Sequence, residues 1–469
     1  MNLASIKSAI NDVGLFKKAY LLNALFITFY YSGWYHLSTI TTVPICFWAL
    51  YLFIQAIKNK RYLLREKALW MLVAFMAVLI LSILVNLPSG LDKNMMSVAA
   101  AALTFFVVYY LGEEDSAKQK KTFEDCLKII LVYSCVMSAI SILMYFSNIC
   151  LVNYKGRFCG VYENAILSGL VANGGLFCTV YFIWGWKRRP LLIKLLCIVQ
   201  IIVQVIMIFV SNSRSAFLCF ITFFVIYIGM KIANLHILKN PNGNRVLKII
   251  VALLTAAAIL MGSGLIADGI NDSMYELNKT LFTLRYPDFD PDNPNYLDTE
   301  NWFAPKPFER DFSSGARWAL VITGWEVFSE NPILGVSPGN LVEVVEDKLT
   351  VNGKAPSYLK ALQGGRIHNS YLDIMASMGI AGALCMLMFA VYTVIKAYQC
   401  TFALRRDYPA YDHNTFVVSL IGAMAVYFFV ESTILFTMSF AEAFFWLCLG
   451  HLAQRAKALD RGRAACIDK

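Results

Sequence analysis

The sequence predicts an all-α integral membrane protein with about twelve transmembrane helices. Hydrophobic residues make up 58% and charged residues 15% of the 469 positions, whereas soluble domains carry roughly a quarter of charged residues. Apolar runs of about 20 residues recur along the chain, and this length crosses a bilayer as a helix. The runs are continuous rather than alternating, which favours helices over the strands of a barrel.

Twelve apolar runs divide the chain. They cover approximately residues 18–35, 37–57, 68–86, 95–112, 127–147, 164–185, 191–210, 214–232, 246–266, 369–398, 414–430 and 433–453. We therefore expect three parts, namely nine spans in residues 1–266, a polar loop in residues 267–367, and three spans with a basic tail in residues 368–469.

The basic residues predict how the chain is oriented in the membrane. Of the 41 Lys and Arg residues, 28 fall in segments on the same side of the membrane as the N-terminus. The other 13 fall on the opposite side, nine of them in the long loop. Because basic residues concentrate in cytoplasmic connections, we expect both termini to be cytoplasmic and one large extracytoplasmic loop between helices 9 and 10. This distribution also explains the net charge of +10, so we expect no nucleic-acid partner.

A polar stretch, VSNSRSAF, separates the seventh and eighth runs at residues 210–217. Within it, Arg214 follows Ser213 at the predicted outer membrane surface. An ionisable residue at membrane depth is costly and suggests a function, although an arginine at a helix end can also extend into water. The polar neighbours favour a hydrated pocket that binds an anion. Arg157, before the sixth span, faces the same side as a further contact or as a solvated loop residue.

The long loop contains a second arginine in an unusual position. Residues 313–330 predict a helix capped by Ser313 or Ser314, with aromatic residues at helical spacing that face a membrane or protein surface. Arg317 falls in the first turn, where the helix dipole disfavours a cation. Beside the unpaired amides of a helix N-terminus, an arginine makes a phosphate site. A plain surface arginine is the alternative.

Four polar residues lead from the loop into the tenth span. Arg366, His368 and Asn369 precede it, and Tyr371 follows His368 by three residues, on the same face if the helix has already begun. Histidine is suited to proton transfer near neutral pH. A lone histidine at a membrane boundary can equally be a hydrogen-bonded interface residue.

The sequence offers little support for a metal or a disulfide. The run DFDPD at residues 288–292 begins like a calcium loop, but Asn293 and Thr299 stand where that loop requires Gly and Glu. The twelve cysteines are scattered singly, almost all in apolar runs, as is typical of core residues. We therefore expect no metal. Whether Cys150 and Cys159, which flank one short connection, form a disulfide stays open.

Three motifs resemble, in their order, those of the O-antigen ligase and O-antigen polymerase superfamily. They are SRSAF at 213–217, SGARW with ENPILGVSPGN at 314–340, and HNSYLDIMASMGIAGAL at 368–384. The resemblance covers the chain from about residue 200. It implies a membrane glycosyltransferase of the C-type architecture that uses glycans on undecaprenyl diphosphate and needs no metal or other cofactor.

By the same resemblance, Arg214, Arg317 and His368 are the catalytic residues, which bind the diphosphate and assist the acceptor. The residue types suit this chemistry, because arginines can neutralise a departing diphosphate and a histidine can activate a hydroxyl. Attack at the anomeric carbon would invert its configuration. Further candidates for substrate contact are Ser213, Arg157, Arg366, Asn369 and Tyr371.

Three functions compete: a polysaccharide polymerase, an O-antigen ligase, and a transporter or lipid flippase. The polymerase and the ligase share the predicted location in the bacterial inner membrane with an extracytoplasmic active site. The loop carries 15 acidic and 9 basic residues between 267 and 368, which favours a polymerase over a ligase that must bind a phosphorylated lipid A core. A transporter or lipid flippase would show two similar halves and a large central cytoplasmic loop, whereas here the long loop comes late and is predicted to lie outside. Expected partners are the lipid-linked donor, a glycan or lipid-linked acceptor, membrane lipids and a chain-length regulator protein.

Overall fold

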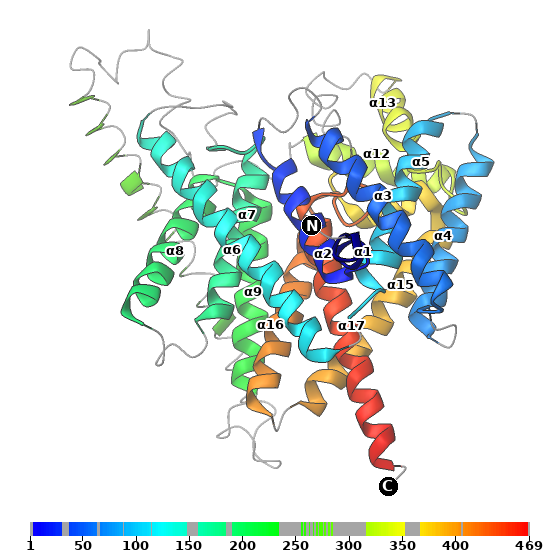
Figure 1. Cartoon of the computed structure of the whole chain (residues 1–469). Helices are drawn as coiled ribbons and strands as arrows, with labels where there is room; N and C mark the ends of the chain where they lie inside the picture. Colours follow the sequence, from blue (N-terminus) through cyan, green and yellow to red (C-terminus); the bar gives the residue numbers. More distant parts are fainter. Residues whose placement is uncertain are drawn as a thin grey trace, which may run out of the picture.

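The computed structural model is built from helices (Figure 1). It describes residues 3–30, 37–62, 66–87, 89–113, 115–147, 158–183, 190–233, parts of 255–284, 316–351, 366–404 and 407–467. In these residues, the only strand-like pairing is a single antiparallel bridge between Phe29 and Tyr162. The predicted all-α fold class is therefore confirmed.

The helices alternate with short connections along most of the chain. The N-terminal helices are α1 (Leu3–Ile10), α2 (Val13–Ile27), α3 (Leu37–Lys58), α4 (Lys67–Val85), α5 (Leu91–Ala102), the π-helix η2 (Leu103–Tyr109), α6 (Ser116–Phe146) and α7 (Ala165–Phe182). The C-terminal helices are α8 (Leu191–Val210), α9 (Arg214–Ala233), α12 (Ala316–Glu330), α13 (Leu341–Val351), α15 (Ser370–Ala403), α16 (Tyr408–Tyr427) and α17 (Phe440–Ile467).

Eight helices among the described residues are long and apolar enough to cross a membrane, and they confirm a multi-pass membrane protein. They are α3, α4, α5 with η2, α6, α7, α8, α9 and α15. The predicted span 18–35 corresponds to the shorter α2, and the last two predicted spans correspond to α16 and α17, which carry polar residues such as Asp412 and Glu442. Most of the predicted span 246–266 lies outside the described residues.

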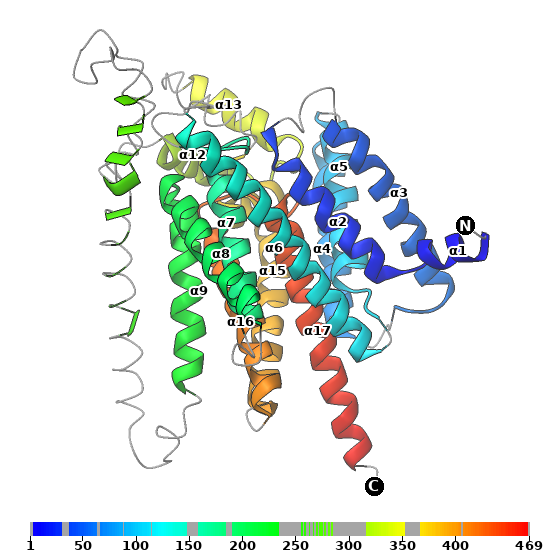
Figure 2. The same cartoon turned by 60° about the vertical axis from the view of Figure 1, so that its left-hand side comes forward.

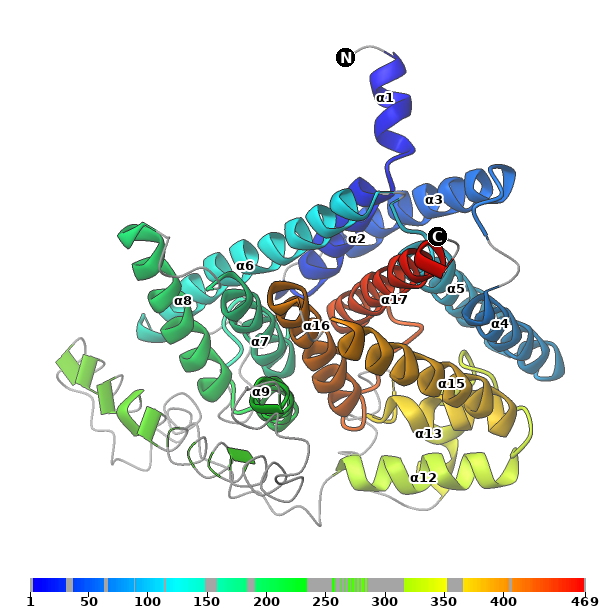
Figure 3. The ribbon, with the colours of Figure 1, turned by 90° about the horizontal axis from the view of Figure 1, so that it is seen from below.

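Helix α17 lies in the middle of the bundle, surrounded by α2, α6, α15, α16 and η2 (Figure 3). Its first half is almost fully buried, with Trp446 as the largest enclosed side chain. Helices α12 and α13 lie at the end of the bundle opposite the C-terminus of α17 (Figure 1, Figure 2). The part of the predicted loop from Ala316 to Val351 therefore lies at one end of the bundle.

Helix α15 is broken at Gly379, where φ is 62° and ψ is −163°. The loop after α12 fills this break. The N–H of Ile380 donates to the carbonyl of Pro332 at 2.7 Å, and the N–H of Val336 donates to the carbonyl of Ala376 at 3.0 Å. A Cβ at Gly379 would collide with the backbone of Ile333. Glycine is therefore required here, and the loop satisfies backbone groups that lipid could not.

The turn GVSPGN after α12 packs on the α4–α5 connection. Asn94 donates to Ser337 Oγ at 3.1 Å and accepts from the N–H of Gly339 at 2.7 Å. Asn86 donates to the carbonyl of Gly335 at 3.0 Å. These hydrogen bonds hold the turn between α12 and α13 against α5, while the backbone bonds described above hold it against α15.

Candidate active site

A buried carboxylate, Glu431, connects two of the residues predicted to be catalytic. Glu431 lies in the connection between α16 and α17, and its side chain is 6% exposed. Nη2 of Arg317, the second residue of α12, lies 2.8 Å from its Oε1 atom. Nδ1 of His368 lies 3.2 Å from its Oε2 atom. The three side chains form one cluster, which we call the Glu431 cluster.

The charge of Glu431 determines the proton arrangement in the cluster. Burial alone would raise the pKa of this carboxyl, but the charge of Arg317 and hydrogen bonds from His368 and Ser215 outweigh burial, so the pKa lies below its usual value. The ionised carboxylate can only accept hydrogen bonds. Nδ1 of His368 therefore carries the proton directed at Glu431.

The third predicted catalytic residue, Arg214, begins helix α9 and is half-buried. Before it, the hydroxyl of Ser213 accepts from the N–H of Ala216 at 3.4 Å, in the manner of an N-cap. After it, Ser215 donates a hydrogen bond to Glu431. The start of α9 therefore adjoins the Glu431 cluster, and Arg214 follows the buried cap Ser213 in the same turn.

The backbone around the cluster is strained. His368 has a φ of 57°, in the left-handed region that few residues other than glycine adopt. Phe436 (69°) and Met438 (48°), in the connection that carries Glu431, and Asn212 (47°), before α9, share this feature. Such conformations persist only where surrounding contacts impose them, and they concentrate at functional sites.

Ser370 fastens the Glu431 connection to α15. Its hydroxyl donates to the carbonyl of Glu431 at 2.7 Å and accepts from the N–H groups of Thr433 and Ile434 at 2.9 and 3.2 Å. This serine is fully enclosed in the bundle. His368, two residues earlier, is therefore fixed against the connection that supplies its carboxylate partner.

A second buried carboxylate, Glu442, fastens the other end of the same connection. Its Oε2 atom accepts from the N–H groups of Thr437 and Met438 at 3.0 and 2.8 Å, and its Oε1 atom accepts from the Thr104 hydroxyl at 2.9 Å. Glu442 lies in the first turn of α17, where the helix dipole favours a negative charge. Neither Glu442 nor Glu431 was predicted as a site residue.

Three residues predicted to bind substrate make contacts within the protein. Nη2 of Arg366 donates to the carbonyl of Phe436 at 3.3 Å. The side chain of Asn369 caps α15 by accepting two N–H groups of its first turn, at 3.1 and 3.0 Å. The hydroxyl of Tyr371 donates to the carbonyl of Ala425 at 2.8 Å. These contacts assign each side chain a positioning role, and substrate binding by them stays a prediction.

Several predictions fall on residues that lie outside the described part of the chain. These are Arg157, Cys150 of the suggested disulfide, the capping residues Ser313 and Ser314, and the acidic run 288–292. Among the residues that are described, no three His, Cys, Asp or Glu side chains lie together as a metal site would require.

A signal for Glu431 was present in the sequence. The segment FVESTILF at 429–436 contains the single acidic residue between the last two predicted spans. Like Arg214, Glu431 is an ionisable residue next to apolar spans, and this pattern suggests a function. The predicted connection has only two residues, 431–432, whereas the structure has twelve residues between α16 and α17.

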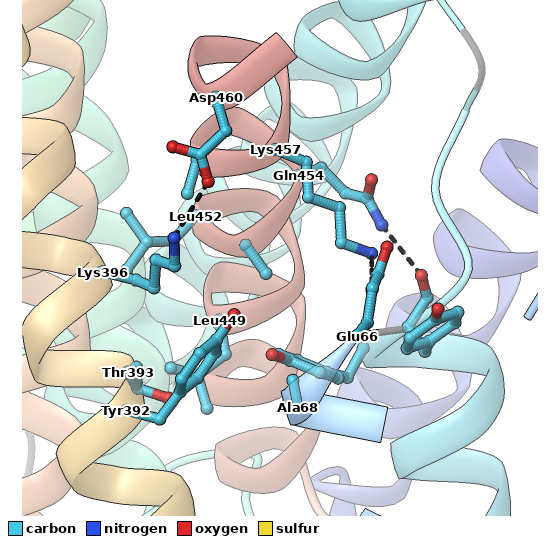
Figure 4. Close-up of a pocket in the computed structure, with 14 residues that line it drawn as sticks. Glu66, Ala68, Tyr392, Thr393, Lys396, Leu449, Leu452, Gln454, Lys457 and Asp460 are labelled. Carbon is cyan, nitrogen blue, oxygen red and sulfur yellow. Dashed lines mark hydrogen bonds and ion pairs between the residues drawn. The ribbon is translucent and has the colours of Figure 1, made fainter. Parts of the chain in front are cut away.

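A separate hollow lies near the other end of the bundle, lined mainly by α15 and α17 (Figure 4). Lys396 and Lys457 border it, and each is paired with a carboxylate: Lys396 with Asp460 at 2.9 Å and Lys457 with Glu66 at 2.6 Å. Its volume of about 40 Å³ admits a few water molecules but no sugar. None of the predicted site residues lines it.

Comparison with known proteins adds a family assignment to this geometry. Residues 199–387 match the family model described as O-antigen ligase. The matched segment includes Arg214, Arg317 and His368 and ends before Glu431. No curated protein matches the chain. Residues 199–387, together with the ordered motifs, are therefore similar to the O-antigen ligase and polymerase superfamily of membrane enzymes.

Proposed function

We propose that this protein is a glycosyltransferase that joins oligosaccharide repeat units carried on undecaprenyl diphosphate. The reaction is metal-independent, inverts the anomeric carbon and takes place at the outer surface of the bacterial inner membrane. The observation that carries the proposal is the Glu431 cluster, in which a half-exposed arginine and a histidine share one buried carboxylate. Such a cluster supplies a cation for a phosphate and an oriented base.

In this mechanism, the hydroxyl oxygen of the acceptor sugar attacks the anomeric carbon of the donor glycan. The bond from that carbon to the diphosphate oxygen breaks, and undecaprenyl diphosphate leaves with the electron pair. Arg317 and Arg214 stabilise the negative charge on the departing diphosphate. A charge contact of this kind contributes on the order of a hundredfold or more in rate.

The hydroxyl proton passes to Nε2 of His368 and then to solvent or the departing diphosphate. Glu431 keeps the imidazole in the tautomer that exposes a basic Nε2 to the acceptor, and it stabilises the imidazolium that forms. Arg317 can serve both groups, because guanidinium has five N–H donors and only Nη2 contacts Glu431 in the hydrogen bonds described. The side chain of Arg317 is 40% exposed, which leaves area for a phosphate.

The second candidate is an O-antigen ligase, which the description of the matched family model favours. A ligase transfers the finished glycan to the lipid A core, which is heavily phosphorylated. The long loop has 15 acidic and 9 basic residues, and this balance suits a sugar acceptor better. Cells distinguish the two activities: loss of a polymerase leaves single repeat units attached, whereas loss of a ligase leaves long chains on undecaprenyl diphosphate.

The decisive experiment incubates purified protein in liposomes with an undecaprenyl diphosphate oligosaccharide and analyses the products by mass spectrometry. We expect products that grow by whole repeat units, and loss of this growth in the Arg317→Ala and His368→Ala variants. Lys348→Ala is the matched control, because it removes a paired cation from the same end of the bundle, where Lys348 lies 2.6 Å from Glu330. Wild-type protein that moves the lipid across the bilayer without extending it would identify a transporter instead.

A further inference from the structure

Helix α12 carries an apolar stripe on its outer face. Trp318 is 59% exposed and Trp325 is 54% exposed, and Ile322 lies between them at helical spacing. The opposite face is fully buried through Leu320 and Val327. An exposed stripe with two tryptophans is costly in water, so a partner must cover it.

The stripe continues into the exposed surface of α15. Ile333, just after α12, and Ile380, just after the break in α15, are both exposed. Their segments are joined directly, because the N–H of Ala381 donates to the carbonyl of Ile333 at 3.3 Å. Beyond the break, α15 is a candidate membrane span, and its exposed apolar residues include Leu384, Leu387, Val391 and Val394.

The orientation of α12 indicates the kind of partner. Seen along the bundle, α12 runs along its outer edge, with its axis in the plane of the view (Figure 3). Seen from the side, it lies at the level where the long helices end (Figure 1). Helices with an apolar face that lie flat at this level dock in the boundary between lipid headgroups and acyl chains, and tryptophan prefers that boundary.

We propose that α12 is an interfacial helix whose stripe lies in the outer lipid leaflet. Arg317 precedes Trp318 directly, so the docked helix keeps its guanidinium at the depth of lipid phosphates. The role of this depth in catalysis rests on the proposed function, because a lipid-linked diphosphate lies at the same depth. The docking itself does not depend on any activity.

Fluorescence in bilayers tests the docking. The chain has nine tryptophans, so wild-type protein is compared with the Trp318→Phe and Trp325→Phe variants in liposomes of phosphatidylcholine brominated near the headgroup or near the chain end. We expect headgroup-proximal bromine to quench wild-type emission, and we expect each variant to lose part of the quenched emission. Trp70→Phe, on the exposed face of α4, is the positive control, and Trp446→Phe, fully buried, is the negative control.

Two outcomes would overturn the docking. Quenching of Trp318 and Trp325 by aqueous iodide but not by brominated lipid would place the stripe in water. Disulfide cross-linking between Trp325→Cys chains in place of lipid quenching would identify a second copy as the partner.

An activity measurement separates the docking from the proposed function. If both hold, the Trp318→Ser/Trp325→Ser double variant extends bilayer-embedded donor more slowly by on the order of tenfold to a hundredfold, because small displacements of a substrate-positioning group have such effects. If wild-type protein is quenched as expected and the double variant extends glycan at the wild-type rate, the docked helix does not position Arg317. Quenching by wild-type protein that extends no glycan would preserve the docking and reject the function.

Discussion

The bundle contains two clusters of polar and ionisable side chains that look alike in composition but differ in setting. In the Glu431 cluster, a buried carboxylate binds a half-exposed arginine and a histidine. In the second, which we call the His451 cluster, Tyr181 donates to Glu124 at 2.9 Å and lies 2.8 Å from Nδ1 of His413, whose Nε2 atom lies 2.7 Å from Nε2 of His451. Ring stacking on Phe123 at 4.1 Å encloses His451.

The hydrogen bonds of the His451 cluster determine which of its nitrogen and oxygen atoms carry protons. Because the Tyr181 hydroxyl donates to Glu124, its oxygen accepts from Nδ1 of His413. A neutral His413 then accepts at Nε2 from His451. All four residues lie on regular helices, and both histidines are buried. The Glu431 cluster instead includes residues with left-handed backbone, such as His368, so backbone conformation distinguishes the two clusters.

The largest expected effect is on His368. Replacing it by glycine removes the base, so glycan extension should fall by about 10²–10⁴-fold. Glycine accepts a φ of 57° without strain, which offsets the lost hydrogen bond to Glu431, so the melting temperature should change little. Activity assays in liposomes and thermal unfolding in detergent measure both quantities. A large loss of stability in His368→Gly would mean that the histidine is a structural residue.

The second-largest effect is expected for Glu431→Gln. The amide retains the shape of the side chain but loses the charge that selects the histidine tautomer and pairs with Arg317. We expect glycan extension to fall on the order of a hundredfold or more, in line with the loss of an orienting carboxylate in other catalytic sites. Product formation at constant protein amount measures this. Near-normal activity would reduce Glu431 to a structural partner of Arg317.

His451→Phe should show the opposite pattern. It leaves a buried nitrogen of His413 without its partner, which costs about 1–3 kcal/mol of stability. Activity per folded molecule should stay within about twofold of wild type, because the His451 cluster does not touch the Glu431 cluster in the contacts described. Melting temperature and extension rate are compared. A folded His451→Phe protein without activity would remove the distinction between the clusters.

A smaller effect concerns stability in acid. The pKa of Glu431 is lowered from 4.5, so its contribution to stability is complete above that value and is lost as the pH falls through the lower, folded-state value. Wild-type protein should therefore lose melting temperature at acid pH more steeply than Glu431→Gln. Melting curves between about pH 3 and pH 7 test the difference, with Lys348→Ala as a control that retains Glu431.

The smallest expected effect is that of a chelator. Two arginines replace a metal in the proposed mechanism, so EDTA should leave the rate of glycan extension unchanged. The assay uses donor and protein freed of divalent ions beforehand. Loss of activity that added Mg²⁺ or Mn²⁺ restores would contradict a metal-independent reaction.

Much of the helical framework could be predicted because hydropathy determines it locally. The predicted span 191–210 matches α8 in both limits, and α9 begins at Arg214 as predicted. Helix α2 begins earlier than predicted, at Val13, because Asp12 caps it by accepting from the N–H of Leu15 at 2.9 Å. Capping by a polar residue thus extends a helix beyond its apolar run.

The site was less predictable because its contacts join distant segments. Arg317 and His368 were predicted, but their common partner Glu431 comes from the connection before the last helix. Asn369 was predicted to contact substrate, whereas its position before Ser370 and an apolar run is also that of an N-cap, the role seen here. No local sequence pattern predicts the hydrogen bond from Asn94 to Ser337.

The break in α15 has a mechanical consequence. Four backbone hydrogen bonds join residues 332–337 to residues 376–381 across it, so α12 and the outer end of α15 behave as one rigid lever. Arg317 sits on one arm and His368 on the other, and their separation stays constant when the lever tilts. Ser370 also fastens the α16–α17 connection to the same end of α15. Glu431 therefore moves with this unit and keeps its contacts to both residues.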